Sequence, residues 1–128
     1  MQDKTPKDIV AQAVEYIESH LHDDITLDDI STHTGYSKFH LNRVFTEEVG
    51  SPLPRYMQAR RLTSAGEQLV ETERPIIDIA HETGYGSQQA FTYAFRQRYG
   101  CAPLAYRRRG KHTPLHQRHG VPQMRMAA

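Results

Sequence analysis

The chain has 128 residues, 38% of them hydrophobic, and a formal net charge of +1, which suits one domain of ordinary size or two very small lobes. No stretch is apolar enough to span a bilayer, and the start MQDKTPKDIV lacks the basic and then apolar pattern of a secretory signal. The single cysteine excludes an internal disulfide, so we expect a cytoplasmic protein.

Residues 1–36 predict two helices, and no segment of the chain shows the alternation of a strand. Thr5 followed by Pro6 suits a helix start, and an apolar stripe of helical spacing follows it as far as Leu21. A second helix is expected after Thr26, with Asp29 placed for a capping box. It should end at Gly35, because glycine readily adopts the left-handed conformation of a helix end.

Residues typical of helix ends also delimit the later helices. We expect these helices at Ser37 to Gly50, Pro52 to about Glu71, Ile76 to Gly84, Ser87 to Gly100 and Pro103 to about Arg109. The sequence thus predicts an all-α fold of seven helices. A first helix-turn-helix lobe (1–52), a linker helix (53–71) and a second lobe (72–110) should precede a flexible tail (111–128), which has no periodicity.

An internal repeat organises this pattern. The tripeptide TGY occurs at 34–36 and again at 83–85, and the neighbouring core positions recur at an offset of 49 and then of 50. Each copy consists of a helix, a glycine turn and a second helix, which is the helix-turn-helix pattern. Two copies with shared spacing are more specific than one helical hairpin, and they indicate two copies of one small fold.

The charge is distributed unevenly along the chain. Residues 1–50 hold four Lys or Arg against ten Asp or Glu, a net −6, whereas residues 51–128 hold twelve against five, a net +7. No acidic residue follows Glu82. A basic half favours a polyanionic partner, although a solvated surface of mixed charge is an alternative, and the total charge does not decide between them.

The outward faces of the two second helices carry residues suited to reading bases. On helical wheels, Leu41, Val44, Phe45 and Val49 point inward in the first copy, and Phe91, Ala94, Phe95 and Tyr99 in the second. Opposite them, positions 39, 42, 43 and 46 of the first copy correspond to positions 89, 92, 93 and 96 of the second. Arginine pairs with guanine, Asn and Gln pair with adenine, and an apolar ring covers the thymine methyl.

Phe39 is the unusual member of this set, because a large apolar ring lies on the polar side of its helix. In a second interpretation, it folds back onto a neighbouring helix. Phosphate contacts are expected from the helix-capping serines and from basic side chains near them: Ser37, Lys38, His40, Ser87, Arg96, Arg98 and Arg107. Any one of the arginines could instead form a surface salt bridge.

The segment RRLTSAGEQLVETERPIIDIAHETGYGSQQAFTYAFRQRYGCAPLAYRRR resembles the signature of the AraC/XylS family of bacterial transcription regulators. The segments GYSKFHLNRVF and SQQAFT look most like its stand-alone branch, typified by MarA, SoxS and Rob. The resemblance implies two helix-turn-helix lobes joined by a long helix. It also implies a monomer that binds double-stranded DNA at asymmetric promoter sites and activates transcription through RNA polymerase. It assigns base contacts to Phe39, Asn42, Arg43, Gln88, Gln89, Thr92 and Tyr93.

The sequence departs from that branch at four positions. The branch usually has Trp where this chain has Phe39, Gln where it has Asn42 and Arg where it has Tyr93. The glycine at position 66 is also unusual for the branch. The Tyr93 departure removes a charged donor from the second reading helix, so its sequence preference is expected to differ or to weaken. We expect no attached ligand-binding domain, and therefore control by the amount of protein and no cofactor.

Parts of the sequence suggest three rival functions. Cys101 could be a nucleophile, but no His, Asp or Glu clusters near it in the sequence, and the repeat aligns it with Ser51, which lies in a turn. We therefore expect that the protein is not an enzyme. His112, His116 and His119 could bind metal, but they lack helical spacing, so we expect no metal. A helical protein-interaction module remains the alternative to DNA binding, though it would not need matched base-reading residues facing outward.

Overall fold

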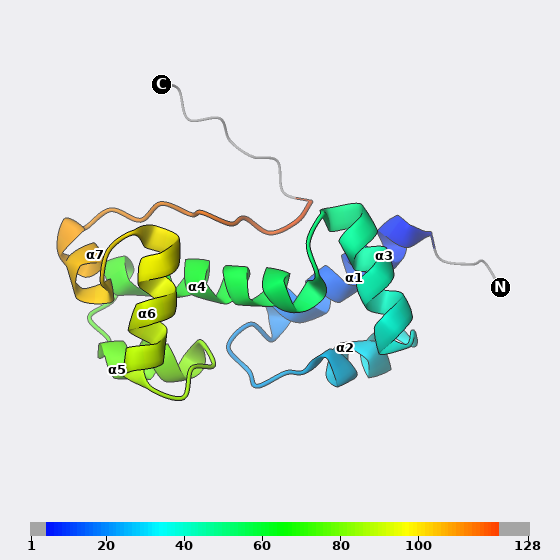
Figure 1. The fold of residues 1–128 in the computed structure, drawn as a ribbon, viewed down its shortest axis with the longest axis horizontal. Coiled ribbons are helices and arrows are strands. Elements are labelled where there is room, and N and C mark those ends of the chain that lie inside the picture. Colours follow the sequence, from blue (N-terminus) through cyan, green and yellow to red (C-terminus); the bar gives the residue numbers. More distant parts are fainter. Residues whose placement is uncertain (1–4, 121–128) are drawn as a thin grey trace, which may run out of the picture. The chain divides into compact units, whose positions relative to one another are not determined.

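The computed structural model describes residues 5–120 of the chain, and these residues form α-helices and no strand. The all-α prediction is therefore confirmed for this part of the chain. Figure 1 labels the helices in chain order: α1 (Pro6–Ser19), α2 (Leu27–Thr34), α3 (Lys38–Val49), α4 (Leu53–Glu71), α5 (Ile76–Glu82), α6 (Gln88–Tyr99) and α7 (Pro103–Arg109). None of these helices is long and apolar enough to cross a bilayer.

Local capping chemistry fixes where the early helices begin and end. Thr5 and Asp8 form a capping box, in which the Asp8 N–H donates to Thr5 Oγ1 at 3.2 Å and the Thr5 N–H donates to Asp8 Oδ2 at 3.1 Å. Thr26 and Asp29 repeat this arrangement at the start of α2, as the sequence predicts. Gly35 ends α2 with φ at 81°, a conformation that disfavours any residue with a Cβ.

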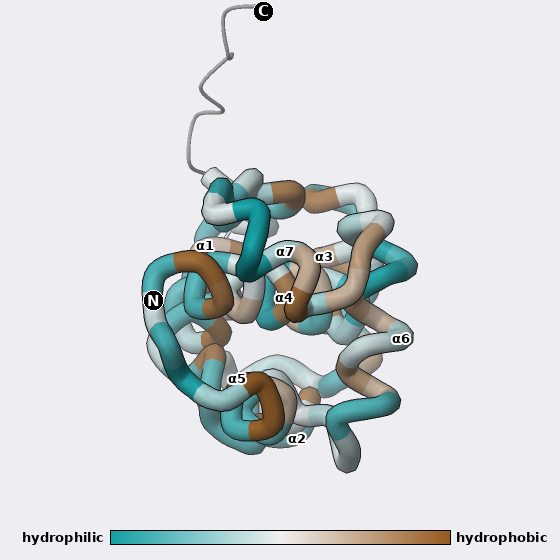
Figure 2. The backbone as a smooth tube through the Cα atoms, turned by 90° about the vertical axis from the view of Figure 1, so that its left-hand side faces the viewer, coloured by the Kyte–Doolittle hydropathy of each residue, from teal (hydrophilic) through white to brown (hydrophobic). Residues whose placement is uncertain are grey.

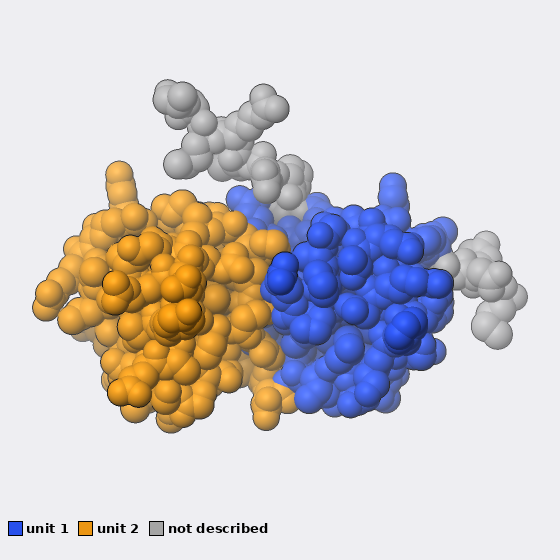
Figure 3. All heavy atoms as spheres, in the orientation of Figure 1, with its two compact units in different colours: residues 1–21, 25–57, 117–128 blue, residues 22–24, 58–116 orange. Residues whose placement is uncertain are grey.

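The described residues fall into two compact units (Figure 3). The first contains residues 5–21, 25–57 and 117–120, and the second contains residues 22–24 and 58–116. The boundary falls within α4, so this helix contributes buried side chains to both units. Tyr56 belongs to the first core, and Leu62 and Leu69 belong to the second.

In the first unit, α3 packs against α1 and α2. The core is apolar and fully buried at its centre, where Ile17, Ile30, Leu41 and Phe45 meet. The Phe45 ring meets the Tyr56 ring edge to face, with centroids 5.2 Å apart. Burying one face of α3 in this way leaves its opposite face to solvent.

In the second unit, α6 packs against α5 and α7 around an aromatic core. Phe91, Phe95 and Tyr106 are fully buried, and the Phe95 ring stacks on Tyr99 with centroids 4.5 Å apart. Figure 2 colours the backbone by hydropathy, and the isoleucine-rich start of α5 is the hydrophobic segment beside its label. Ile79 from that segment lies in the same core.

The segment after α7 corrects one expectation from the sequence. A loose tail is predicted from residue 111, but hydrogen bonds anchor residues 111–120. Within the second unit the Thr113 N–H donates to Tyr106 Oη at 2.7 Å, and Arg60 donates to the His116 carbonyl at 2.5 Å. Within the first unit the His119 N–H donates to Tyr56 Oη at 2.8 Å. The rest of the predicted tail, 121–128, lies outside the described residues.

Gly66 explains part of this anchoring. It is buried within α4, and a Cβ added there would lie 3.2 Å from His112 Cε1 and 3.2 Å from Tyr99 Oη. The absence of a side chain thus lets the His112 ring lie against the helix backbone. These contacts show that Gly66 permits close packing against α4.

Candidate nucleic-acid interface

The outward face of α3 is exposed as the helical wheel predicts. The helix buries Leu41, Val44 and Phe45. On the opposite side Arg43 is exposed, and the Phe39 side chain is 86% exposed. The interpretation in which Phe39 packs against a neighbouring helix is therefore wrong. A phenyl ring held in water is available to cover an apolar group of a partner.

Asn42 lies beside this face but has a structural task. Its side chain is half-buried, and its Oδ1 accepts a hydrogen bond from the Leu53 N–H at 2.9 Å. The bond satisfies a donor at the start of α4 that has no partner within its own helix. The amide NH₂ of Asn42 makes no hydrogen bond among the described residues, so it can contact a base edge as a donor.

The residues predicted to meet phosphates around the start of α3 differ in how they are held. Ser37 Oγ accepts from the His40 N–H at 3.2 Å, which leaves its own hydroxyl proton to donate. Lys38 Nζ lies 3.0 Å from Asp28 Oδ1 in an exposed ion pair of the kind that contributes little to stability. His40 is half-buried, with its ring 5.5 Å from that of Tyr36.

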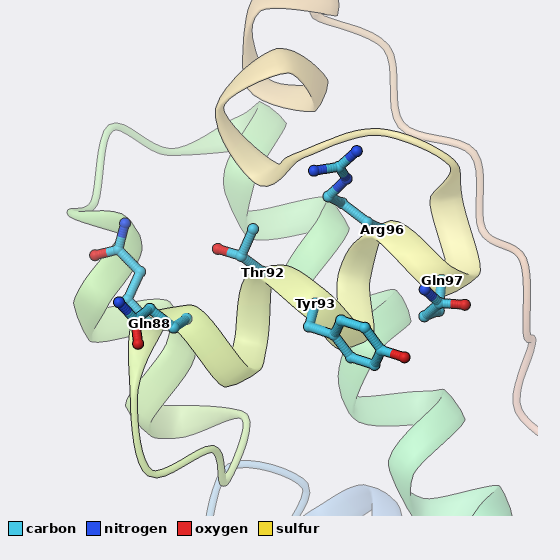
Figure 4. Close-up of a pocket in the computed structure, with 6 residues that line it drawn as sticks. Gln88, Thr92, Tyr93, Arg96 and Gln97 are labelled. Carbon is cyan, nitrogen blue, oxygen red and sulfur yellow. The ribbon is translucent and has the colours of Figure 1, made fainter.

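The α6 face presents its predicted base readers together. Gln88, Gln89 and Tyr93 are exposed, with Tyr93 at 69%, and Thr92 is half-buried. With Arg96 and Gln97 they line a shallow hollow of about 570 Å³ (Figure 4). Gln88 is the first residue of α6 and is exposed.

Gln97 is a member of this surface that the sequence interpretation omits. It is exposed and lies one turn beyond Tyr93, as Tyr93 lies one turn beyond Gln89. Residues spaced by four share one face of a helix, so this spacing was enough to find it.

The residues predicted to contact phosphates near α6 differ in whether hydrogen bonds within the protein already engage them. Arg96 is exposed beside the reading face, Arg98 is half-buried, and Ser87 Oγ accepts from the Ala90 N–H at 3.1 Å as the helix cap. Arg107 is occupied: its Nε donates to the Leu69 carbonyl at 2.8 Å and its Nη2 to the Arg74 carbonyl at 2.6 Å. These bonds satisfy backbone groups where α4 ends, so we leave Arg107 out of the phosphate set.

The structure also places the cysteine and one of the histidines that suggest an enzyme or a metal site. Cys101 is half-buried against the second core. Within residues 5–120, no group of three or more His, Cys, Asp or Glu is arranged to hold a metal ion. His112 Nδ1 and Tyr106 Oη form a hydrogen bond of 3.0 Å.

Comparison with known proteins identifies this arrangement. A family model described as a helix-turn-helix domain matches residues 30–109, more than half of the chain. The chain is 39% identical over 101 residues to the regulatory protein SoxS of Salmonella typhimurium, covering 79% of the chain and 94% of SoxS.

This chain belongs to the AraC/XylS family.

Other AraC/XylS relatives extend the comparison. The chain is 40% identical over 99 residues to the HTH-type transcriptional activator AarP of Providencia stuartii, covering 77% of the chain and 73% of AarP. Some relatives are much longer, and the chain spans 33% of the Bacillus subtilis regulator YbfP. Among solved structures, the C-terminal domain of AraT, a response regulator from Geobacillus stearothermophilus, is 32% identical with a TM-score of 0.74. That match covers 88% of this chain and 93% of the AraT domain.

The family confirms the all-helical fold and the predicted class of function. The chain is a DNA-binding transcription regulator of the AraC/XylS type.

Proposed function

We propose that this regulator binds an asymmetric double-stranded promoter site as a monomer and reads one major-groove segment with α3 and another with α6. Activation of transcription through contact with RNA polymerase is part of the proposal, and it rests on the family resemblance and on relatives such as AarP. We place the protein in the cytoplasm, where bacterial promoters lie, and assign it no catalytic step.

One observation carries the proposal: α3 and α6 expose base-reading side chains at positions that the internal repeat makes equivalent. Positions 39 and 89 correspond, as do 43 and 93, and all four residues are exposed. Each helix buries its opposite face in its own unit. In a helix-turn-helix the second helix, near its start, enters the major groove, and these residues lie in that part.

The two reading faces offer complementary chemistry. In α3, Arg43 can donate two hydrogen bonds to guanine, Phe39 can cover a thymine methyl, and the Asn42 amide can donate to an acceptor. In α6 we assign base contacts to Gln88, Gln89, Thr92 and Tyr93, with Gln97 added at the far end of the face. Glutamine suits adenine, because it offers a donor and an acceptor together.

Contacts to the DNA backbone would position both helices. We assign them to Ser37, Lys38 and His40 beside α3, and to Ser87, Arg96 and Arg98 on α6. The Ser37 and Ser87 hydroxyls accept from backbone N–H groups and keep a proton to donate to a phosphate oxygen. Lys38 would exchange its exposed partner Asp28 for a phosphate, at little loss because such pairs are weak.

Selection of tight-binding duplexes from a random library tests this function. The expected result is two short motifs about one helical turn apart, bound by monomer, with affinity that falls steeply as salt rises. Arg43→Ala should weaken binding by about 1–3 kcal/mol and relax the preference at one position of one motif. Lys7→Ala removes one positive charge from an exposed position of α1, and the consensus selected by this variant should be unchanged.

The outcomes separate the alternatives. A uniform loss of affinity across all sequences in Arg43→Ala would assign Arg43 to phosphate. Failure to enrich any consensus would contradict the proposal and favour a helical protein-interaction module, whose partner would then cover Phe39.

A further inference from the structure

Arg43 and Tyr93 occupy equivalent positions in the two reading helices but have unlike chemistry. The internal repeat aligns them at the offset of 50 that also aligns Phe45 with Phe95 in the two cores. Both side chains are exposed. A guanidinium on one helix is thus replaced by a phenol ring on the other, at the same place relative to the buried face.

The surroundings of Tyr93 leave it available to a ligand. The side chain is 69% exposed, and within residues 5–120 no group is hydrogen-bonded to its hydroxyl. Gln89 lies four residues, about one turn, before Tyr93. Gln97 lies one turn after Tyr93, and Arg96 lines the same hollow (Figure 4). Neither the core nor a hydrogen bond within the described residues holds the ring, so it is available to contact a partner.

The chemistry of the ring determines which base edge it can distinguish. A single phenol hydroxyl can donate to N7 or O6 of a purine or to O4 of thymine, so it discriminates poorly among bases. The apolar ring does discriminate, because thymine alone presents a methyl group in the major groove. Unlike Arg43, Tyr93 cannot donate two parallel hydrogen bonds to guanine.

We propose that Tyr93 makes the α6 half-site prefer a thymine, recognised through its 5-methyl group, at the position equivalent to the one where Arg43 makes the α3 half-site prefer guanine. This inference rests on the proposed function, since it assumes that both helices read DNA. It gives the two half-sites different sequences, which fixes the direction in which the protein lies on its site.

The test uses the full chain and duplexes carrying the selected consensus. The half-site read by α6 is assigned independently, as the motif whose preference changes in Gln89→Ala. Each thymine of that motif is then replaced in turn by deoxyuridine, which removes the methyl group and keeps the base pair. Wild-type protein should lose about fourfold in affinity at one thymine, the loss expected for one buried methyl.

Variants of Tyr93 decide whether the ring is responsible. Tyr93→Phe should keep the fourfold difference between thymine and deoxyuridine, and Tyr93→Ala should abolish it. Tyr93→Arg should change the preferred base to guanine in a repeated selection, and Arg43→Tyr should make the reverse change in the other motif. Since Tyr93 is exposed, these variants are expected to fold as the wild type, which their thermal unfolding midpoints will check.

The possible results distinguish a failure of the role of Tyr93 from a failure of the proposed function on which it rests. A flat deoxyuridine scan, or a fourfold loss that persists in Tyr93→Ala, overturns the role of Tyr93 while a two-motif consensus keeps the proposed function. Absence of any consensus overturns the proposed function itself, and the inference with it.

Discussion

The His112 ring lies against Gly66 so closely that a methyl group at Gly66 would meet it at 3.2 Å. The ring cannot easily retreat, because His112 Nδ1 lies 3.0 Å from Tyr106 Oη. Glycine within a helix costs about 1 kcal/mol relative to alanine. The contact therefore explains why a residue unfavourable to α4 is present there.

We predict that Gly66→Ala lowers the free energy of unfolding by about 1 kcal/mol. Overpacking against His112 and Tyr99 costs about 1–3 kcal/mol, and the gain in helix propensity offsets part of it. Urea denaturation measures the difference. Gly86→Ala is the control, since a Cβ there meets nothing within 4 Å, and it should change stability by less than about 0.5 kcal/mol. A Gly66→Ala protein more stable than the wild type would contradict the packing argument.

His112 should also make stability depend on pH. Burial lowers the pKa of His112 below 6.5, outweighing the opposite effect of Glu67 and Glu71. Since the Thr113 N–H donates to Tyr106 Oη, the Tyr106 O–H is free to donate to Nδ1, which protonation would block. The unfolded chain binds the proton more readily, so the stability contributed by neutral His112 is complete above pH 6.5 and lost as pH falls below it.

The variant His112→Asn tests this dependence, because an amide oxygen can replace the acceptor but does not titrate. We expect the free energy of unfolding of the wild type to fall more steeply than that of the variant between pH 7 and pH 5. Urea titrations at a series of pH values measure both curves. Parallel curves would show that His112 does not cause the dependence.

Arg107 should matter for stability rather than for DNA binding. Its two hydrogen bonds to the Leu69 and Arg74 carbonyls come from a charged donor, so Arg107→Ala should lower the free energy of unfolding by about 2 kcal/mol. Arg108→Ala is the matched control: its side chain is exposed, and the change should stay within about 0.5 kcal/mol. If both variants were equally stable while Arg107→Ala alone weakened DNA binding, the phosphate role would be restored to Arg107.

Asn42 should show two separable roles. Asn42→Asp keeps an oxygen for the Leu53 N–H and loses the NH₂. The midpoint temperature of thermal unfolding should therefore be unchanged or slightly higher, while the base preference at one position of the site is lost. Asn42→Ala loses the cap as well and should cost about 1 kcal/mol of stability. An unchanged consensus in Asn42→Asp would limit Asn42 to capping.

The sequence was sufficient for the helices because their ends depend on neighbouring residues. The capping box of Thr26 and Asp29 and the left-handed Gly35 involve groups only a few positions apart, so composition and spacing reveal them. The repeat and the apolar stripes likewise predicted which side of α3 and α6 is buried. The exposure of Phe39 followed from the same helical geometry.

The sequence alone determined the seven helices, the duplicated helix-turn-helix pattern and the outward base-reading residues, because each depends on local hydrogen bonding or on the periodicity of one helix. Only the tertiary structure decided that Arg107 satisfies the end of α4, that Asn42 caps its start, and that residues 111–120 are anchored with His112 against Gly66. The contacts of Asn42, Arg107 and Gly66 join residues from 11 to 46 positions apart, and the hydrogen bond from His119 to Tyr56 joins residues 63 positions apart. No periodicity marks such a pair, because its partners are brought together only when separate helices pack.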